Sequence, residues 1–119
     1  MDRIELVKKI ARVLDDKKAI DIKALEITEL TIVADAFVIA NGTSNTHVKS
    51  LANEVEYELS QIGIEPNHIE GKATGWILLD YGSVVIHIFL SDSREYYNLE
   101  RLWADAKEID LSDVITEDE

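Results

Sequence analysis

Residues 76–90 read WILLDYGSVVIHIFL, two short apolar runs that are separated by Tyr81 and Gly82. Glycine at the second position of a two-residue loop is typical of a tight hairpin, so this stretch predicts two antiparallel strands joined at Tyr81 and Gly82. Counting along both strands from that loop places Trp76 opposite His87. This hairpin is the element against which the other segments are expected to pack.

The predicted hairpin has two unlike surfaces, because side chains alternate between the faces of a strand and cross-strand partners share a face. The first surface is uniformly apolar and is expected to face the core; it carries Ile77, Leu79, Val84, Ile86, Ile88 and Leu90. The second surface mixes large apolar groups with polar ones; it carries Trp76, Leu78, Asp80, Ser83, Val85, His87 and Phe89. This second surface is either covered by other parts of the chain or available to a partner.

Length and composition predict one globular domain. The chain has 119 residues, of which 46% are hydrophobic and 30% charged, and this composition is not that of a disordered protein. It has no cysteine, which excludes disulfides, thiolate zinc sites and thiol nucleophiles, and which fits a reducing cytoplasm. No stretch is apolar enough for a signal peptide or a membrane span, so we expect neither export by that route nor membrane insertion.

The net charge of −12 favours a basic protein partner. An anionic protein repels phosphate backbones, so binding to naked nucleic acid is not expected. Residues 107–119 hold six acidic residues and one lysine, a net charge of −5. They carry little apolar area, so we predict an acidic, mobile tail after a domain that spans residues 1–106.

The remaining chain predicts further helices and strands. Apolar residues recur at helical spacing in residues 2–16, and again between a cap at Thr43 or Ser44 and a terminating Gly63. Strand patterns cover residues 20–27, 36–40 and 67–70. The first pattern has an irregularity near Ala24. The second is a continuous apolar run and predicts a strand that is buried on both faces. A strand, a short polar loop and a helix in succession are the start of an α/β unit.

Catalytic chemistry has weak support. Residues 42–45, GTSN, lie before a predicted helix, where free backbone N–H groups favour anions, but they lack the P-loop lysine and the three-glycine dinucleotide spacing. Nucleotidyl transfer also needs two carboxylates that hold magnesium, and Asp80 stands alone in its strand. The three histidines are too scattered to form a metal site. We therefore expect no catalytic residue, cofactor or metal.

A partner surface has better support. Besides Phe89, five aromatic residues fall in or just after the hairpin, close to Arg94 and Arg101: Trp76, Tyr81, Tyr96, Tyr97 and Trp103. Aromatic and arginine side chains are the commonest anchors of protein interfaces. Tyr97 and Trp103 fit equally well as parts of a small core. Trp76 favours the interface, because it shares its surface with Asp80 and His87.

Short motifs follow one another along most of the chain: Ala34-Asp35, Phe37-Val38-Ile39, Gly42-Thr43-Ser44, His47-Val48, Glu70-Gly71, Trp76-Ile77-Leu78-Leu79-Asp80-Tyr81-Gly82, Val84-Val85 with His87, Arg94, Tyr97, Leu99-Glu100 and Leu102-Trp103. Taken together and in this order they resemble the ribosomal silencing factors, also called the Iojap family. The family has an arginine before the histidine of the Gly-Thr-Ser segment, where this chain has Thr46.

The resemblance implies a single α/β domain over residues 1–106, with a mixed sheet and flanking helices, similar to nucleotidyltransferases but without their catalytic residues. It implies a translational repressor that binds the large ribosomal subunit at ribosomal large-subunit protein fourteen and blocks joining of the small subunit, with a further role in large-subunit assembly. Homodimers are also implied. The implied contact residues are Trp76, Leu78, Asp80, Tyr81, His87, Arg94, Tyr97, Glu100, Leu102 and Trp103.

Two alternatives to this function stay open. One is a nucleotide-binding or nucleotidyltransferase-like enzyme that uses residues 42–45. The other is a dimeric adaptor whose partner is not ribosomal.

Overall fold

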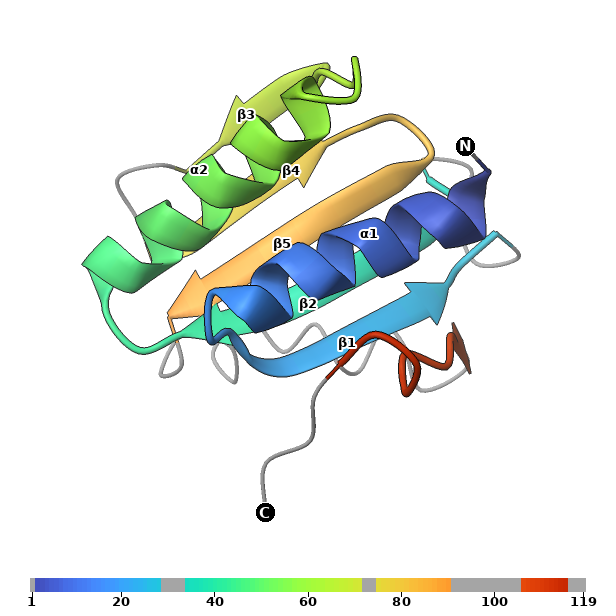
Figure 1. The fold of residues 1–119 in the computed structure, drawn as a ribbon, viewed down its shortest axis with the longest axis horizontal. Helices are drawn as coiled ribbons and strands as arrows, with labels where there is room; N and C mark the ends of the chain where they lie inside the picture. The colour runs from blue at the N-terminus through green and yellow to red at the C-terminus, as the bar shows by residue number, and fades with distance from the viewer. Residues whose placement is uncertain (1, 29–33, 72–74, 91–105, 116–119) are drawn as a thin grey trace.

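The computed structural model describes residues 2–28, 34–71, 75–90 and 106–115. Two helices and six strands lie in this part of the chain (Figure 1). In chain order they are α1 (Arg3–Asp16), β1 (Ile20–Glu26), β2 (Ala36–Gly42), α2 (Asn45–Ser60), β3 (His68–Glu70), β4 (Trp76–Asp80), β5 (Val84–Leu90) and β6 (Lys107–Glu108). All but β6 fall close to the predicted ranges.

The strands form one mixed sheet in the order β3-β4-β5-β2-β1-β6. Strands β2 and β5 pair in parallel, whereas the other neighbouring pairs are antiparallel. Both described helices lie on one side of the sheet, in front of it in Figure 1. We call this side the helix face and the other side the opposite face. The predicted single-domain α/β fold with a mixed sheet is confirmed.

Both helices begin at side-chain caps, which satisfy backbone N–H groups that have no partner inside the helix. In α1, the N–H of Glu5 donates to the carboxylate of Asp2 over 2.8 Å, and the N–H of Asp2 donates back to Glu5 over 3.1 Å. In α2, the hydroxyl oxygen of Ser44 accepts from the N–H of His47 over 3.1 Å, so Ser44 is the cap of the two predicted. Neither described helix is long and apolar enough to cross a bilayer.

The β4–β5 hairpin forms, but its register differs from the prediction by two residues. Trp76 lies opposite Phe89 and not opposite His87. The loop consists of Gly82 and Ser83, and Gly82 takes a φ of +86°, as a type II′ turn requires at its first position. Because side chains alternate with a period of two, a shift of two leaves every side chain on its predicted surface.

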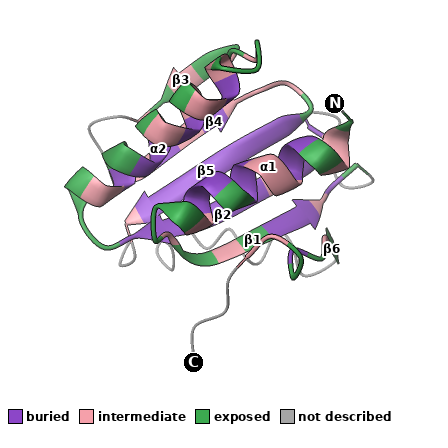
Figure 2. Ribbon diagram, viewed as in Figure 1, coloured by how far each residue is buried: buried purple, intermediate pink, exposed green. Residues whose placement is uncertain are grey.

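Strand β5 lies in the middle of the sheet and is buried along almost its whole length (Figure 2). On the helix face it joins the main core, in which the first surface of the hairpin packs against α1 and α2 as predicted. On the opposite face a second apolar cluster forms, with these buried members: Leu25, Ile27, Ala34, Ile39, Val85 and Phe89. The apolar run at residues 36–40 thus contributes to both clusters, as its lack of alternation predicts.

Strand β1 contains the predicted irregularity, but nearer its start than Ala24. Its pairing with β2 is interrupted between Ile20 and Lys23, and Asp21 has a φ of 53°. Such a bulge changes which side chains face each side of the sheet. Ile22 therefore packs against the main core, whereas Ile20 remains 40% exposed.

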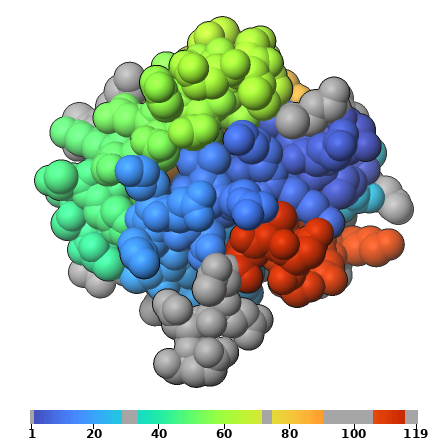
Figure 3. Space-filling view, in the orientation of Figure 1, coloured from blue at the N-terminus to red at the C-terminus, as the bar shows by residue number. Residues whose placement is uncertain are grey.

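Residues 107–115, which the sequence predicts to be part of a mobile tail, pack against the domain (Figure 3). Strand β6 pairs with β1, and the N–H of Ile109 donates to a β1 carbonyl over 2.8 Å. The ammonium of Lys8 in α1 lies 2.8 Å from the carboxylate of Asp113. The prediction was wrong for this segment because the acidic charge concealed four apolar side chains that pack on the main core: Ile109, Leu111, Val114 and Ile115.

We predict that Leu111→Ala lowers the free energy of unfolding by about 2–4 kcal/mol, because it removes a side chain that is only 8% exposed in the core. Urea unfolding followed by circular dichroism measures this. Asp113→Asn is the matched control in the same segment: it removes an exposed ion pair and should shift the midpoint little, and less still at high salt. Equal midpoints for wild type and Leu111→Ala would show that the segment adds nothing to stability.

Candidate partner-binding surface

Four aromatic rings lie together on the opposite face of β2, β4 and β5. We call Phe37, Trp76, His87 and Phe89 the aromatic cluster. The Trp76 ring is stacked on His87 and on Phe89, at centroid distances of 5.8 and 5.4 Å. Phe37 meets the His87 ring edge-on at 4.6 Å, because the parallel pairing of β2 with β5 places Phe37 beside Val85. Such ring pairs add to the stabilisation that burial provides.

His87 lies in this cluster as a neutral imidazole. The indole Nε1–H of Trp76 donates to Nδ1 of His87 over 3.1 Å. An indole N–H can only donate, so Nδ1 must accept and the single proton of the neutral ring is on Nε2. That Nε2 is buried and has no hydrogen-bond partner in the part of the chain that the structure describes. Burial lowers the pKa of His87 from 6.5 to about 4, because desolvation disfavours the cation.

Trp76 and Leu78 give the cluster its accessible side. Both are half-buried, and they project from the same face of β4 because they are two residues apart. The neighbouring edge strand β3 contributes His68 and Glu70, which are exposed and paired with each other, and Asp80 lies across from His68. The surface is therefore an apolar patch with carboxylates along one border.

Two of the predicted contact residues support this surface from within. His87 is only 5% exposed, so the prediction of a direct partner contact does not fit its position beneath Trp76. The carboxylate of Asp80 accepts from the backbone N–H of Gly82 over 2.8 Å and so supports the hairpin loop. Asp80 is still half-buried, so one side of it is accessible.

Tyr81 does not belong to this surface. Its side chain packs against the main core on the helix face, because it continues the alternation of Leu79. Burial, with smaller effects of Glu56 and Glu65, raises the pKa of Tyr81 to about 12. The predicted contact residues that follow the hairpin lie outside the described residues: Arg94, Tyr97, Glu100, Leu102 and Trp103.

Comparison with known proteins assigns this chain to a family. The family model described as "Ribosomal silencing factor during starvation" matches residues 1–119. The chain belongs to the ribosomal silencing factor family.

Two bacterial relatives match this silencing factor over most of their length. "Ribosomal silencing factor RsfS" of Bacillus subtilis is 41% identical over 112 residues, which are 93% of this chain and 95% of the relative. The protein of the same name from Halalkalibacterium halodurans is 39% identical, over 98% of this chain and 100% of the relative. A crystal structure of a Chromobacterium violaceum protein, 38% identical, superimposes with a TM-score of 0.83 over 87% of both chains. The resemblance seen in the motifs is confirmed.

In this silencing factor, parts of the loop of residues 42–45 are bonded to the side chain and backbone of His47. The N–H of Thr43 donates to Nδ1 of His47 over 2.9 Å, and Nε2 of His47 lies 2.9 Å from the carbonyl oxygen of Lys17. Because Nδ1 accepts, Nε2 carries the proton and donates. Ser44 caps α2, and its hydroxyl oxygen accepts from the N–H of His47. Two backbone N–H groups near the start of α2, those of Thr43 and His47, are thus engaged internally, which counts against the nucleotide alternative.

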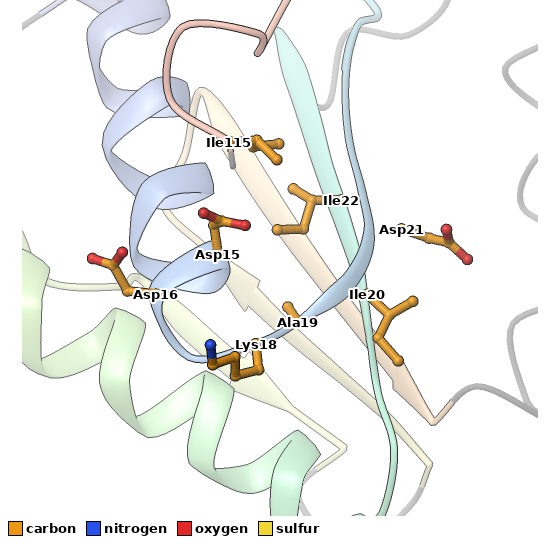
Figure 4. A pocket seen from close by; sticks show the side chains of 8 residues that line it. All are labelled: Asp15, Asp16, Lys18, Ala19, Ile20, Asp21, Ile22 and Ile115. Carbon is orange, nitrogen blue, oxygen red and sulfur yellow. The ribbon is translucent and has the colours of Figure 1, made fainter. Parts of the chain in front are cut away.

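A cavity of about 610 Å³ opens between the end of α1, the start of β1 and Ile115 (Figure 4). Asp15, Asp16 and Asp21 line it, but Asp21 points to the other side of β1 from Asp15, so the carboxylates do not converge. Across the described residues, no group of three or more His, Asp or Glu side chains could hold a metal ion. Strands β2 and β5 separate β1 from β4, so the cavity is not part of the candidate surface around Trp76 and Leu78.

The sequence places Trp76 opposite His87 but does not reveal Phe37 as a neighbour of His87, nor the hydrogen bond from Trp76 to His87. The apolar run that contains Phe37 predicts a buried strand, but nothing local in it reveals its parallel pairing with β5. Trp76 and His87 are diagonal neighbours in the observed register, which is within reach of two ring side chains. The one available signal was a single polar residue, His87, in the apolar run of β5.

We predict that this protein loses stability as the pH falls from 6.5 to 4. In the unfolded chain His87 takes up a proton near pH 6.5, whereas in the folded protein it does so only near pH 4. The unfolded state therefore binds more protons than the folded state in this range, and the free energy of unfolding falls by roughly 3 kcal/mol by pH 4. Above pH 6.5 the contribution is complete.

Urea unfolding of wild type and His87→Phe across this range measures the effect. The phenyl ring cannot be protonated, so the variant should lack this component of the pH dependence, while carboxylates elsewhere affect both proteins equally. Parallel pH profiles for the two proteins would contradict the prediction.

Proposed function

We propose that this silencing factor is a non-enzymatic translational repressor that binds the large ribosomal subunit in the cytoplasm. The observation that carries this proposal is the accessible pair Trp76 and Leu78, on the sheet face that both described helices leave uncovered, in a member of this family. The motif resemblance points to ribosomal large-subunit protein fourteen as the partner. It also points to a role in assembly of that subunit.

The chemistry of the surface fits a basic protein. Aromatic and aliphatic side chains at its centre can pack against apolar groups of a partner or insert into its pockets, as anchors of protein interfaces do. Glu70 and Asp80 at its border, together with a net charge of −12, attract lysine and arginine side chains. The same charge repels ribosomal RNA, which directs binding towards a protein on the subunit surface.

Repression then requires only obstruction. The folded chain extends 34 × 33 × 33 Å. A body of this size on a surface that must meet the small subunit occupies space that the small subunit needs. Because no bond is made or broken, the effect should depend on occupancy of the site alone, and it should reverse when the protein dissociates.

We predict that Trp76→Ala weakens binding to purified large subunits by at least ten-fold, because it removes the largest side chain of the patch. Co-sedimentation through sucrose with increasing protein concentration measures the affinity. Tyr57→Ala is the matched control, since Tyr57 is an aromatic residue that is 58% exposed on α2, on the helix face. A second matched pair is Leu78→Ala against Ile62→Ala, because Ile62 is 46% exposed away from the patch.

Unfolding midpoints of all four variants separate loss of binding from loss of fold. Wild-type protein that does not sediment with large subunits would refute the proposed function. If wild type binds and Trp76→Ala binds equally well, the function survives but the surface is misassigned.

We predict that wild-type protein, incubated first with large subunits, lowers the extent of subunit joining in a light-scattering assay. The inhibition should saturate with the same concentration dependence as binding. Trp76→Ala should require correspondingly more protein, whereas Tyr57→Ala should inhibit like wild type. Tight binding without any effect on joining would contradict obstruction as the mechanism.

Homodimerisation is a further part of this proposal. An apolar sheet face can pair with the same face of a second copy, since two-fold interfaces use one surface twice. Dimers formed through Trp76 and Leu78 would hide the residues that bind the ribosome. Self-association and ribosome binding would then compete, and the Trp76→Ala variant would lose both.

A further inference from the structure

We propose that His87 is the positioning residue of the partner surface: by accepting the indole N–H, it fixes the orientation in which Trp76 is presented to the partner. This inference rests on the proposed function, because it concerns the same surface. It assigns His87 a role that differs from direct contact, and it gives a physical reason for a histidine inside an apolar strand.

The indole of Trp76 is held at one edge and along its plane. Its N–H donates to His87 over 3.1 Å, and its ring is stacked at 25° to His87 and at 17° to Phe89. A hydrogen bond selects one rotation of the indole, since stacking alone would tolerate others. A side chain that is already oriented loses less conformational entropy on binding, and this raises affinity.

An imidazole at this position is unfavourable for the fold in other respects. Its Nε2–H is buried without a hydrogen-bond partner among the described residues, and buried donors of this kind destabilise a protein. Phe37 and Phe89 show that phenyl rings fit the cluster, and a phenylalanine at position 87 would leave no polar atom unpaired. What a phenyl ring cannot supply is the acceptor for Trp76.

Burial also keeps the acceptor available. Nδ1 can accept only while the ring is neutral, because the protonated ring carries hydrogen on both nitrogens. Desolvation lowers the pKa of His87 to about 4, so the ring is neutral at physiological pH. At physiological pH, where the protein would meet a ribosome, Nδ1 therefore remains an acceptor for the indole N–H of Trp76.

The first test compares His87→Phe with His87→Asn in affinity for purified large subunits and in urea midpoint. His87→Phe keeps a stacked ring and loses the acceptor, so we expect a midpoint equal to or above that of wild type and about ten-fold weaker binding. His87→Asn places its side-chain oxygen near the position of Nδ1, and we expect it to restore part of the affinity. A merely structural role predicts that binding follows the midpoint in both variants.

The second test follows the indole N–H of Trp76 itself by ¹H–¹⁵N spectroscopy, with Trp103→Phe used to assign the two indole signals. His87→Phe should shift the Trp76 signal and speed its exchange with solvent, and His87→Asn should do so less. Trp76→Phe removes the donor and keeps an aromatic ring. In that background His87→Phe should cause no further loss of affinity, because the interaction it removes is already absent.

The outcomes separate this inference from the proposed function. If wild-type protein does not bind large subunits, the proposed function is refuted, and with it any role of the indole orientation in binding. Wild type that binds, together with a His87→Phe variant that binds equally well, refutes the positioning role alone. Additive losses in Trp76→Phe and His87→Phe also refute it, because they show that His87 acts independently of the indole N–H.

Discussion

Strand β5 has to satisfy two different environments at once, and the arrangement around it follows from that constraint. Its residues from Val84 to Phe89 are all buried. On one side α1 and α2 cover the alternate side chains, and on the other side the rings of neighbouring strands do so. The single polar residue of the strand, His87, faces the rings. A polar group in that position needs a hydrogen-bond partner, and Trp76 on the adjacent strand provides one.

The sequence predicts the faces of the sheet much better than the pairing of the strands. Which side chains of the hairpin share a surface depends only on whether their numbers are odd or even, so an error of two residues in register does no harm. The error came from the loop: both Tyr81-Gly82 and Gly82-Ser83 contain the glycine that a tight turn needs. The positive φ of Gly82 at the first loop position decides between them, and no local pattern reveals it.

Two features of the site were beyond sequence reasoning for a different reason. The aromatic cluster depends on parallel pairing between β2 and β5, which are separated in the chain by α2, β3 and β4. The C-terminal segment depends on Leu111, which reaches the core although acidic residues surround it. In both cases the decisive contact joins residues far apart in the chain, whereas periodicity reports only on neighbours. That Trp76 and Leu78 lie on the same face of the sheet was predictable, because this follows from alternation within one strand.

The two described strands at the margins of the sheet, β3 and β6, are also its shortest, with three and two residues. A sheet invites further strands to add along its margins, and short margins offer an incoming chain few backbone groups to bond. The short edge strands therefore disfavour edge-to-edge pairing of many copies of this protein into one continuous sheet. Growth of that kind has no natural end, whereas contact through the flat of the sheet stops at two molecules. The brevity of β3 and β6 therefore helps to keep whatever association occurs finite.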